Sequence, residues 1–337
     1  MCLYPIYGNN PKFKPNKTNG GVPPVCTDKR LLIVPFKCGK CIECRKQKQR
    51  EWSIRLNEWI REKDAYFITA TFSEESLAGL QKESGLKWEE NANDIATLAL
   101  RRCLERIRKN TRKSIKHWFI TELGDEKGRI HLHGIICGKE DLKNFYENWK
   151  YGFVDIGKWC NGQTINYICK YMLKVNIKYP NFQGKVLCSK GIGSEYFKRN
   201  TNEWQKENYK TIEVPTYKFR NGSKVAMPKY YKDRVFNEEQ REKMWTNNLE
   251  RGIEWIGGEK VKAEDIKTIE KLRKWYRKRG QELFFDDPVK WDEQKQIKKM
   301  EKQRKHIADN RKRLNRGNAK GVSAGQGKQV KNIKTKY

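Results

Sequence analysis

The chain has 337 residues, which is enough for one large domain or two smaller ones. It carries 73 lysines and arginines against 41 aspartates and glutamates, a formal net charge of +32. This surplus predicts a polyanionic partner, either nucleic acid or an anionic membrane surface. The sequence has no apolar stretch of about 18 residues, which excludes a membrane-spanning segment. Because residues 1–15 also lack the pattern of a signal peptide, we expect a cytosolic protein whose cysteines are thiols or metal ligands.

Hydrophobic periodicity predicts an α+β fold for the first half of the chain. Residues 1–30 are rich in proline, glycine and asparagine, and we expect them to form an extended arm. The elements expected after it are a helix over 41–64, a strand over 66–72, a helix over 94–111, strands over 116–123 and 129–137, a helix over 139–150, a strand over 152–158 and a helix over 164–178. This order predicts a mostly antiparallel central sheet flanked by helices.

The second half of the chain is less regular. A β-hairpin is expected over residues 211–229, around Asn221-Gly222. Residues 237–310 are expected to be mostly helical and charged, and residues 311–337 to form a disordered basic tail. These changes of pattern divide the chain into an N-terminal arm, cysteine box and helix (1–64), a sheet core (65–180), a mixed and helical region (181–310) and the tail (311–337).

A cysteine box precedes the first expected helix. Cys38, Cys41 and Cys44 are spaced Cys-x2-Cys-x2-Cys, and either Cys2 or Cys26 could supply a fourth thiol. Zinc sites more often combine one Cys-x2-Cys knuckle with a second pair. The box is therefore a candidate structural zinc site, with free thiols packed at a helix start as the alternative.

The strand over 129–137 carries two of the four histidines of the chain. Side chains two apart on a strand share a face, so His131 and His133 project together. Two imidazoles held in this way can bind a divalent metal ion, and Glu122 on the neighbouring strand could add an oxygen ligand. From the pattern alone, a pair of ordinary histidines and a solvated carboxylate are equally good interpretations.

The helix over 164–178 has two contrasting faces. Its apolar stripe consists of Ile165, Ile168, Cys169 and Met172. Tyr167, Lys170, Tyr171 and Lys174 lie on the opposite side, at steps of three and four residues. A phenol becomes a nucleophile once its proton is withdrawn, and a lysine offsets phosphate charge, so this face suits attack on a phosphodiester polarised by a metal ion. The alternative is that the tyrosines are surface residues without a ligand.

The basic residues around these two elements have separate expected roles. Lys170 is a candidate catalytic residue because it lies between the two tyrosines. Arg129, at the start of the histidine strand, and Lys174 are candidate DNA-binding residues, since arginine and lysine make most contacts with phosphates.

Several motifs together resemble a known family. His131-Leu132-His133 is similar to the His-hydrophobe-His motif of the HUH endonucleases, residues 66–72 resemble their first motif, and residues 167–171 resemble their two-tyrosine motif. More narrowly, the chain resembles the replication initiators of microviruses, of the gokushovirus branch. That resemblance covers about residues 1–235 and also rests on residues 2–3, 10–13, 38–45, 151–153, 191–193 and 228–231.

The resemblance implies a site-specific nuclease that nicks circular phage DNA. Such an enzyme stays linked to the 5′ end through a phosphotyrosine, while the free 3′ hydroxyl primes rolling-circle replication. It implies that His131, His133 and Glu122 bind Mg²⁺ or Mn²⁺, and that Tyr167 and Tyr171 are alternating nucleophiles. The expected partners are single-stranded and supercoiled circular phage DNA with its origin, and a host helicase and polymerase in the bacterial cytoplasm, with no membrane.

The chain departs from the family pattern in one place, and two other classes of function remain open. Gly-Glu-Tyr-Gly is common before the histidine strand, but residues 121–124 read Thr-Glu-Leu-Gly and keep only the carboxylate and the last glycine. A transposase or relaxase of the same superfamily would use the same chemistry. A non-catalytic binder resembling an RNA-recognition domain would share the order of elements, but it has no use for the two histidines.

Overall fold

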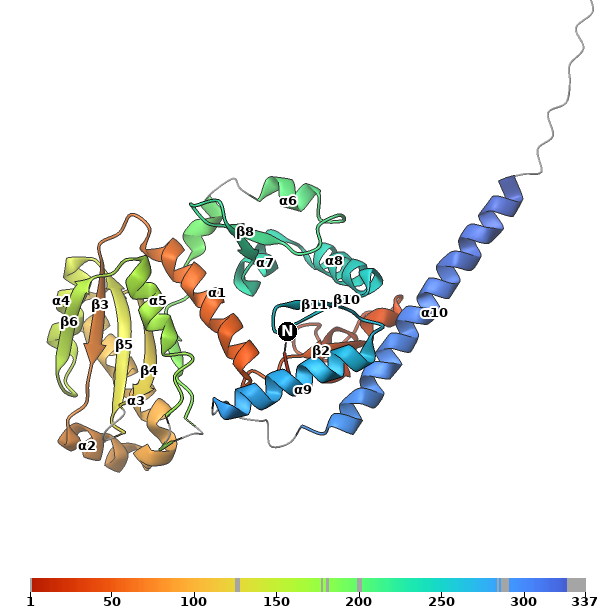
Figure 1. The fold of residues 1–337 in the computed structure, drawn as a ribbon. Coiled ribbons are helices and arrows are strands. Elements are labelled where there is room, and N and C mark those ends of the chain that lie inside the picture. The colour runs from red at the N-terminus through yellow and green to blue at the C-terminus, as the bar shows by residue number, and fades with distance from the viewer. Residues whose placement is uncertain are drawn as a thin grey trace, which may run out of the picture.

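The computed structural model describes residues 2–124, 128–176, 178–179, 182–198, 202–283, 285 and 291–325. Its centre is a five-stranded sheet with the order β6-β3-β5-β4-β7, in which every neighbouring pair is antiparallel (Figure 1). The strands are β3 (Ala65–Ala70), β4 (His117–Leu123), β5 (Ile130–Cys137), β6 (Val154–Trp159) and β7 (Val186–Cys188). The predicted fold class, an antiparallel sheet flanked by helices with a mostly helical C-terminal region, is confirmed. The sheet core extends past its predicted end at residue 180, because β7 pairs with β4.

Helices cover both faces of this sheet. One face packs against α2 (Glu74–Ser84), α3 (Trp88–Thr111) and α4 (Lys139–Asn148), and the other against α1 (Ile42–Ile60) and α5 (Gly162–Lys170). On β5, the alternate residues Ile130, Leu132 and Ile136 belong to the cluster beneath α3. The intervening positions, which include His131 and His133, therefore face α1 and α5.

A glycine in the histidine strand allows close packing at the centre of the sheet. Gly134 lies against Phe119 of β4, and a Cβ atom at this position would be 2.2 Å from Cδ1 of that ring. The Phe119 ring is fully buried and stacks on Phe145 of α4, with ring centroids 5.2 Å apart. The absence of a side chain at Gly134 is thus a packing requirement.

The two ends of the described chain form a separate lobe beside the sheet (Figure 1). This terminal lobe contains β1 (Ile6–Asn9), β2 (Ile33–Phe36), β10 (Ile253–Ile256), β11 (Glu259–Lys262), α9 (Ile266–Glu282) and α10 (Glu293–Gly325). Short 3₁₀ helices occupy Pro11–Phe13 and Lys29–Leu31. The expected extended arm over 1–30 is therefore partly wrong, because Cys2, Leu3 and Tyr4 are buried and β1 pairs with β2.

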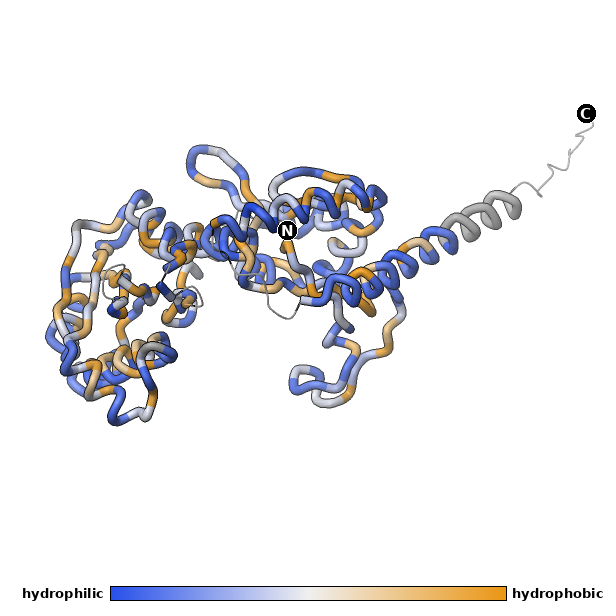
Figure 2. The backbone as a smooth tube through the Cα atoms, turned by 60° about the horizontal axis from the view of Figure 1, so that its bottom comes forward, coloured by the Kyte–Doolittle hydropathy of each residue, from blue (hydrophilic) through white to orange (hydrophobic). Residues whose placement is uncertain are grey.

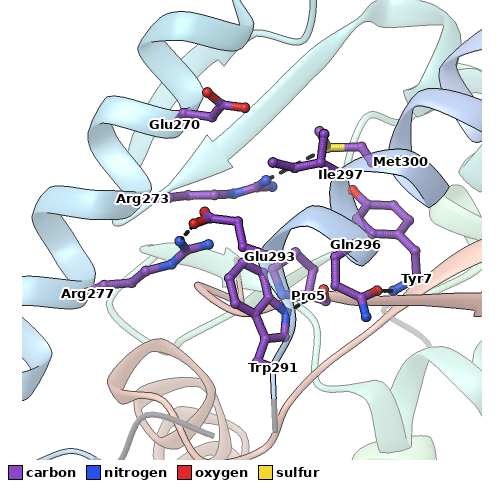
Figure 3. Close-up of a pocket in the computed structure, with 10 residues that line it drawn as sticks. All are labelled: Pro5, Tyr7, Glu270, Arg273, Arg277, Trp291, Glu293, Gln296, Ile297 and Met300. Carbon is purple, nitrogen blue, oxygen red and sulfur yellow. Dashed lines mark hydrogen bonds and ion pairs between the residues drawn. The ribbon is translucent and has the colours of Figure 1, made fainter. Parts of the chain in front are cut away.

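Hydrogen bonds join the N-terminal segment to the last helices (Figure 3). The backbone N–H of Tyr7 donates to Oε1 of Gln296 at 2.8 Å, and the indole N–H of Trp291 donates to the carbonyl of Pro5 at 3.1 Å. Arg277 of α9 and Glu293 of α10 form an ion pair at 2.7 Å. These contacts hold segments from opposite ends of the sequence in one structural unit.

A third unit lies between the sheet and the terminal lobe. It contains the 3₁₀ helix Ser194–Lys198, α6 (Glu203–Glu207), β8 (Thr216–Lys218), β9 (Lys224–Ala226), α7 (Lys229–Val235) and α8 (Glu238–Arg251). Strands β8 and β9 form the hairpin predicted around Asn221-Gly222. The region expected to be mostly helical contains α8, α9 and α10, but the sequence analysis missed the β10–β11 hairpin and its Gly257-Gly258 turn.

Helix α1 connects all of these parts. Its residue Cys44 lies in the core of the terminal lobe, Ile54 in the core of the third unit, and Trp59 in the core beneath the sheet. A single continuous helix therefore contributes to three hydrophobic clusters, and it runs from the terminal lobe to the sheet in Figure 1.

Helix α10 passes the predicted start of the basic tail. It continues to Gly325, so the boundary placed at residue 311 is wrong, and residues 326–337 lie outside the described part. Lysine, arginine and alanine have high helix propensity, which explains how a charged segment can remain helical. The coloured part of α10 is mostly hydrophilic and extends away from the rest of the molecule (Figure 2). Among the helices in the described residues, none is both long and apolar enough to cross a membrane.

Candidate active site

Strands β4 and β5 bring Glu122, His131 and His133 together. Glu122 and His131 are direct cross-strand partners, and His133 projects from the same face two residues later. The Glu122 Oε2 atom lies 3.2 Å from Nε2 of His133 and 3.6 Å from Nδ1 of His131. The three residues predicted as metal ligands therefore form one cluster.

Lys174 completes the charge balance of this cluster. Its ammonium group contacts the second carboxylate oxygen of Glu122, which is a buried residue. Burial alone would raise the pKa of Glu122. Hydrogen bonds with His131, His133 and Lys174, and the lysine charge, outweigh this effect and hold the pKa of Glu122 well below its usual range. Glu122 is therefore an ionised carboxylate at neutral pH, and Lys174, predicted as a DNA contact, lies beside it.

Two residues of β3 orient the His133 ring, and the sequence analysis gave neither of them a role. Thr69 is the cross-strand partner of His133, and its hydroxyl lies 3.1 Å from Nδ1 of that ring. Phe67 stacks at a ring-centroid distance of 5.9 Å with an interplanar angle of 9°. The signal was present in the alternation along this strand, which places Phe67 and Thr69 on the face that the histidines use.

The two predicted nucleophiles lie directly beside the histidines. The ring of Tyr171 stacks on His133, and its hydroxyl donates a hydrogen bond of 2.8 Å to the hydroxyl of Tyr167. Tyr167 is 52% exposed and makes an edge contact with Phe67. Asn161 caps the start of α5, since its side chain accepts hydrogen bonds from the N–H groups of residues 163 and 164.

The end of α5 differs from its prediction in a way that shapes the site. The helix ends at Lys170 and not near residue 178, and the chain continues in turns bonded three residues back, such as Lys174 N–H to the carbonyl of Tyr171 at 3.3 Å. Side chains three apart are eclipsed in such 3₁₀ turns. Tyr171 and Lys174 therefore point to the same side, and both reach the His133–Glu122 pair.

The other two predicted basic residues lie outside this cluster. Lys170 is the last residue of α5 and its side chain is exposed. Arg129 forms an ion pair with Glu74 at the start of α2. Their predicted roles in catalysis and DNA binding remain predictions.

The donor set of Glu122, His131 and His133 fits a divalent cation. Two imidazoles and a carboxylate are ligands that Mn²⁺ and, with more oxygen donors, Mg²⁺ accept. The histidine ring centroids are 6.3 Å apart, and both rings contact the carboxylate itself. A bound cation would therefore replace these contacts with metal–ligand bonds.

The cysteine box forms a second cluster, in the terminal lobe. The sulfur atoms of Cys2, Cys38, Cys41 and Cys44 all lie within 4.8 Å of one another. Cys26, the other candidate for the fourth position, instead donates its thiol to the carbonyl of Asp28 at 3.1 Å. Among the described residues, this is the single group that brings three or more such ligand atoms so close together.

The fold and the site define a class of protein when they are compared with known families. Residues 65–176 match a family model that describes the replication-associated protein ORF2. The matched segment contains Glu122, both site histidines and both site tyrosines, whereas the cysteine box lies before it.

Individual relatives are replication-associated proteins of phages and related viruses. The chain is 26% identical over 317 residues to replication-associated protein ORF2 of Spiroplasma virus 4, covering 79% of this chain and 95% of that protein. It is 24% identical to replication-associated protein VP4 of Bdellovibrio phage phiMH2K, over 72% of this chain and 78% of that protein. For replication-associated protein ORF4 of Chlamydia phage 1, the identity is 22%, over 59% of this chain and 53% of that protein. These matches confirm the predicted resemblance to microvirus replication proteins, and no solved structure matches the chain significantly.

Proposed function

We propose that this chain is a replication initiator endonuclease, which nicks the origin of a circular phage DNA and becomes linked to the 5′ end through a tyrosine. The observation that carries the proposal is the contact of Tyr171 with His133, which shares the Glu122 carboxylate with His131. A nucleophile, a metal-ligand set and a lysine thus meet on one face of the sheet. Similarity to replication-associated proteins of phages supports a role in replication, and the site supports the nuclease chemistry.

The proposed reaction is a transfer of a phosphodiester from DNA to a tyrosine. The phenolic oxygen attacks the scissile phosphorus, so that a bond from phosphorus to Oη forms and the bond from phosphorus to the 3′ oxygen breaks. The phenol loses its proton and the departing 3′ oxygen gains one. The product has a 5′ phosphotyrosine and a free 3′ hydroxyl, from which a host polymerase, with a host helicase ahead of it, would extend the strand in the bacterial cytoplasm.

Residues around the tyrosines would prepare this attack. Thr69 holds the His133 ring with Nε2 toward Glu122, which leaves Tyr171 stacked on the flat face of the imidazole. Lys174 places a positive charge beside the same site, where it can offset charge on a phosphate. A divalent cation bound by His131, His133 and Glu122 would polarise the scissile phosphate.

The hydrogen-bonded pair of tyrosines fits two successive cuts. The hydroxyls lie 2.8 Å apart, so both can reach a phosphate held at one position. One tyrosine would hold the 5′ end after the first cut, while the other would cut the regenerated origin. The formal net charge of +32 would supply the non-specific affinity for DNA during this cycle.

Two alternatives keep part of this proposal. A transposase or relaxase would use the same covalent step on another DNA, and similarity to phage replication-associated proteins favours the phage origin. A non-catalytic DNA binder would need neither the tyrosine pair nor the metal-ligand set.

The proposal is tested with single-stranded DNA segments that together cover the phage genome. The full chain is incubated with each segment and Mn²⁺, and the products are separated on a denaturing gel. We expect one segment to give a covalent protein–DNA adduct and a shorter strand with a free 3′ hydroxyl. Formation of no adduct with any segment, on either strand, would contradict the nuclease and leave a DNA-binding protein.

A further inference from the structure

We propose that Cys2, Cys38, Cys41 and Cys44 bind one zinc ion that organises the terminal lobe. All four sulfur atoms lie within 4.8 Å of one another, and those of Cys38 and Cys44 are 3.9 Å apart. In a tetrahedral site with Zn–S bonds of about 2.3 Å, neighbouring sulfurs are about 3.8 Å apart. The separation of the thiols is therefore that of a closed, four-sulfur zinc site.

The backbone around the box also supports metal-bound thiolates. The N–H of Cys38 points at the sulfur of Cys2 at 3.3 Å, and the N–H of Cys41 points at the sulfur of Cys38 at 3.4 Å. Such N–H groups stabilise the negative charge that thiolates keep when they bind a metal. Gly39 has φ of +78°, which lets the chain turn between the first two cysteines of the box.

Other uses of four neighbouring thiols fit the geometry less well. Two disulfides would need two pairs at bonding distance, whereas the four sulfurs form one compact group. A four-iron cluster would hold its thiolates farther apart, because each one binds a different iron atom. A single tetrahedral ion is the occupant that matches the observed size.

The surroundings of the cluster show what the ion would hold together. Cys2 comes from the N-terminal segment, and Cys44 lies in the first turns of α1. The same hydrophobic cluster contains Ile256 of β10 and Ile269 of α9. Four segments that are distant in sequence thus meet around the thiols, in a lobe with a small apolar core. Small cores commonly depend on a metal ion for stability.

The first measurement is the metal content of the full chain, purified without chelators. We expect about one zinc per chain, and we expect four of the ten cysteines to react with a thiol reagent only after a chelator has removed the metal. Replacing zinc with Co²⁺ should produce the sulfur-to-cobalt charge-transfer and visible bands of a tetrahedral thiolate site. Preparations that contain no metal and react at all ten thiols, or that contain iron, would overturn the proposal.

Serine variants then test which cysteines bind the ion. Cys2→Ser and Cys44→Ser should lose zinc, whereas the matched controls Cys26→Ser and Cys188→Ser should keep it. Retention of zinc by Cys2→Ser together with its loss from Cys26→Ser would overturn the assignment of the fourth ligand. The cobalt spectrum of the unaltered chain keeps the proposal testable even if a variant fails to fold.

This inference is independent of the nuclease proposal. The sheet and its site residues lie outside the cysteine cluster, so a zinc-bound protein without nicking activity would contradict only the proposed function. A metal-free protein that forms the DNA adduct would contradict only the zinc site.

Discussion

The imidazole ring of His133 lies flat against the phenol ring of Tyr171, with ring centroids 4.1 Å apart and an angle of 3° between the planes. A metal ligand and a nucleophile are therefore in contact before any substrate binds. Because the ring is also fixed by Thr69 and Glu122, little rearrangement is needed to place the tyrosine beside a metal-bound phosphate.

The tyrosine pair gives the first prediction. Tyr167→Phe and Tyr171→Phe should each retain some single-cut activity, because phenylalanine fills the same space but cannot attack phosphorus. The double variant should form no covalent adduct, yet still bind DNA. Adduct formation on a denaturing gel and peptide mass mapping measure both results.

The control for these variants is Tyr146→Phe, which changes an exposed tyrosine of α4 and should leave the adduct unaffected. An adduct on some other residue in the double variant would contradict both assignments. Full turnover by one single variant would contradict only the alternating scheme.

The metal-ligand set gives the second prediction. His131→Ala should lower nicking of a supercoiled circle by about 100-fold or more, because the activating cation loses a ligand. Non-specific DNA binding should stay nearly unchanged, since it depends on lysine and arginine contacts spread over the surface. His306→Ala, in α10, is the matched control, and equal nicking by both variants in Mn²⁺ would show that His131 is no ligand.

The basic C-terminal segment gives the third prediction. Truncation after Arg313 preserves the hydrogen bond from Arg311 to the carbonyl of Glu250 and removes the lysines that follow. The slope of log affinity against log salt should become shallower by about 0.7–0.9 for each phosphate that the shortened chain no longer neutralises. A full-length variant with glutamine at Lys320, Lys328 and Lys331 should show part of the same change, and an unchanged slope in both would mean that the segment does not bind DNA.

The close packing at Gly134 gives the fourth prediction. Gly134→Ala should lower the free energy of unfolding by about 1–3 kcal/mol, because the added Cβ would overlap the Phe119 ring. Gly79→Ala is the matched control: this glycine lies inside α2 with open space around it, so alanine should stabilise the protein by about 0.5–1 kcal/mol. Thermal unfolding measures both, and an unchanged midpoint for Gly134→Ala would show that the sheet relaxes without cost.

Local patterns were sufficient to predict the sheet and the histidine face. The alternation along β5 and the hairpin before it place Glu122 across from His131, and both are local features of the sequence. The end of α5 was not predictable in the same way, because the apolar stripe that defined the helix stops at Met172 while contacts with Glu122 hold the residues beyond it.

Long-range pairing accounts for the remaining differences. Strand β7 has only three residues and exists through its pairing with β4, and Cys2 reaches the box because the N-terminal segment packs against α9. Neither partner can be deduced from the composition of the segment itself. The role of Thr69 likewise depends on its register opposite His133, which a strand pattern alone does not fix.

Helix α1 also sets a length scale for the molecule. Its 19 residues span about 28 Å, which is close to the rise of about eight base pairs of duplex DNA. If the terminal lobe holds DNA while the tyrosines cut it, α1 acts as a ruler between the two points of contact. An origin for this protein would then need a fixed spacing between its nicked phosphate and its flanking site, and that spacing could change only together with the length of the helix.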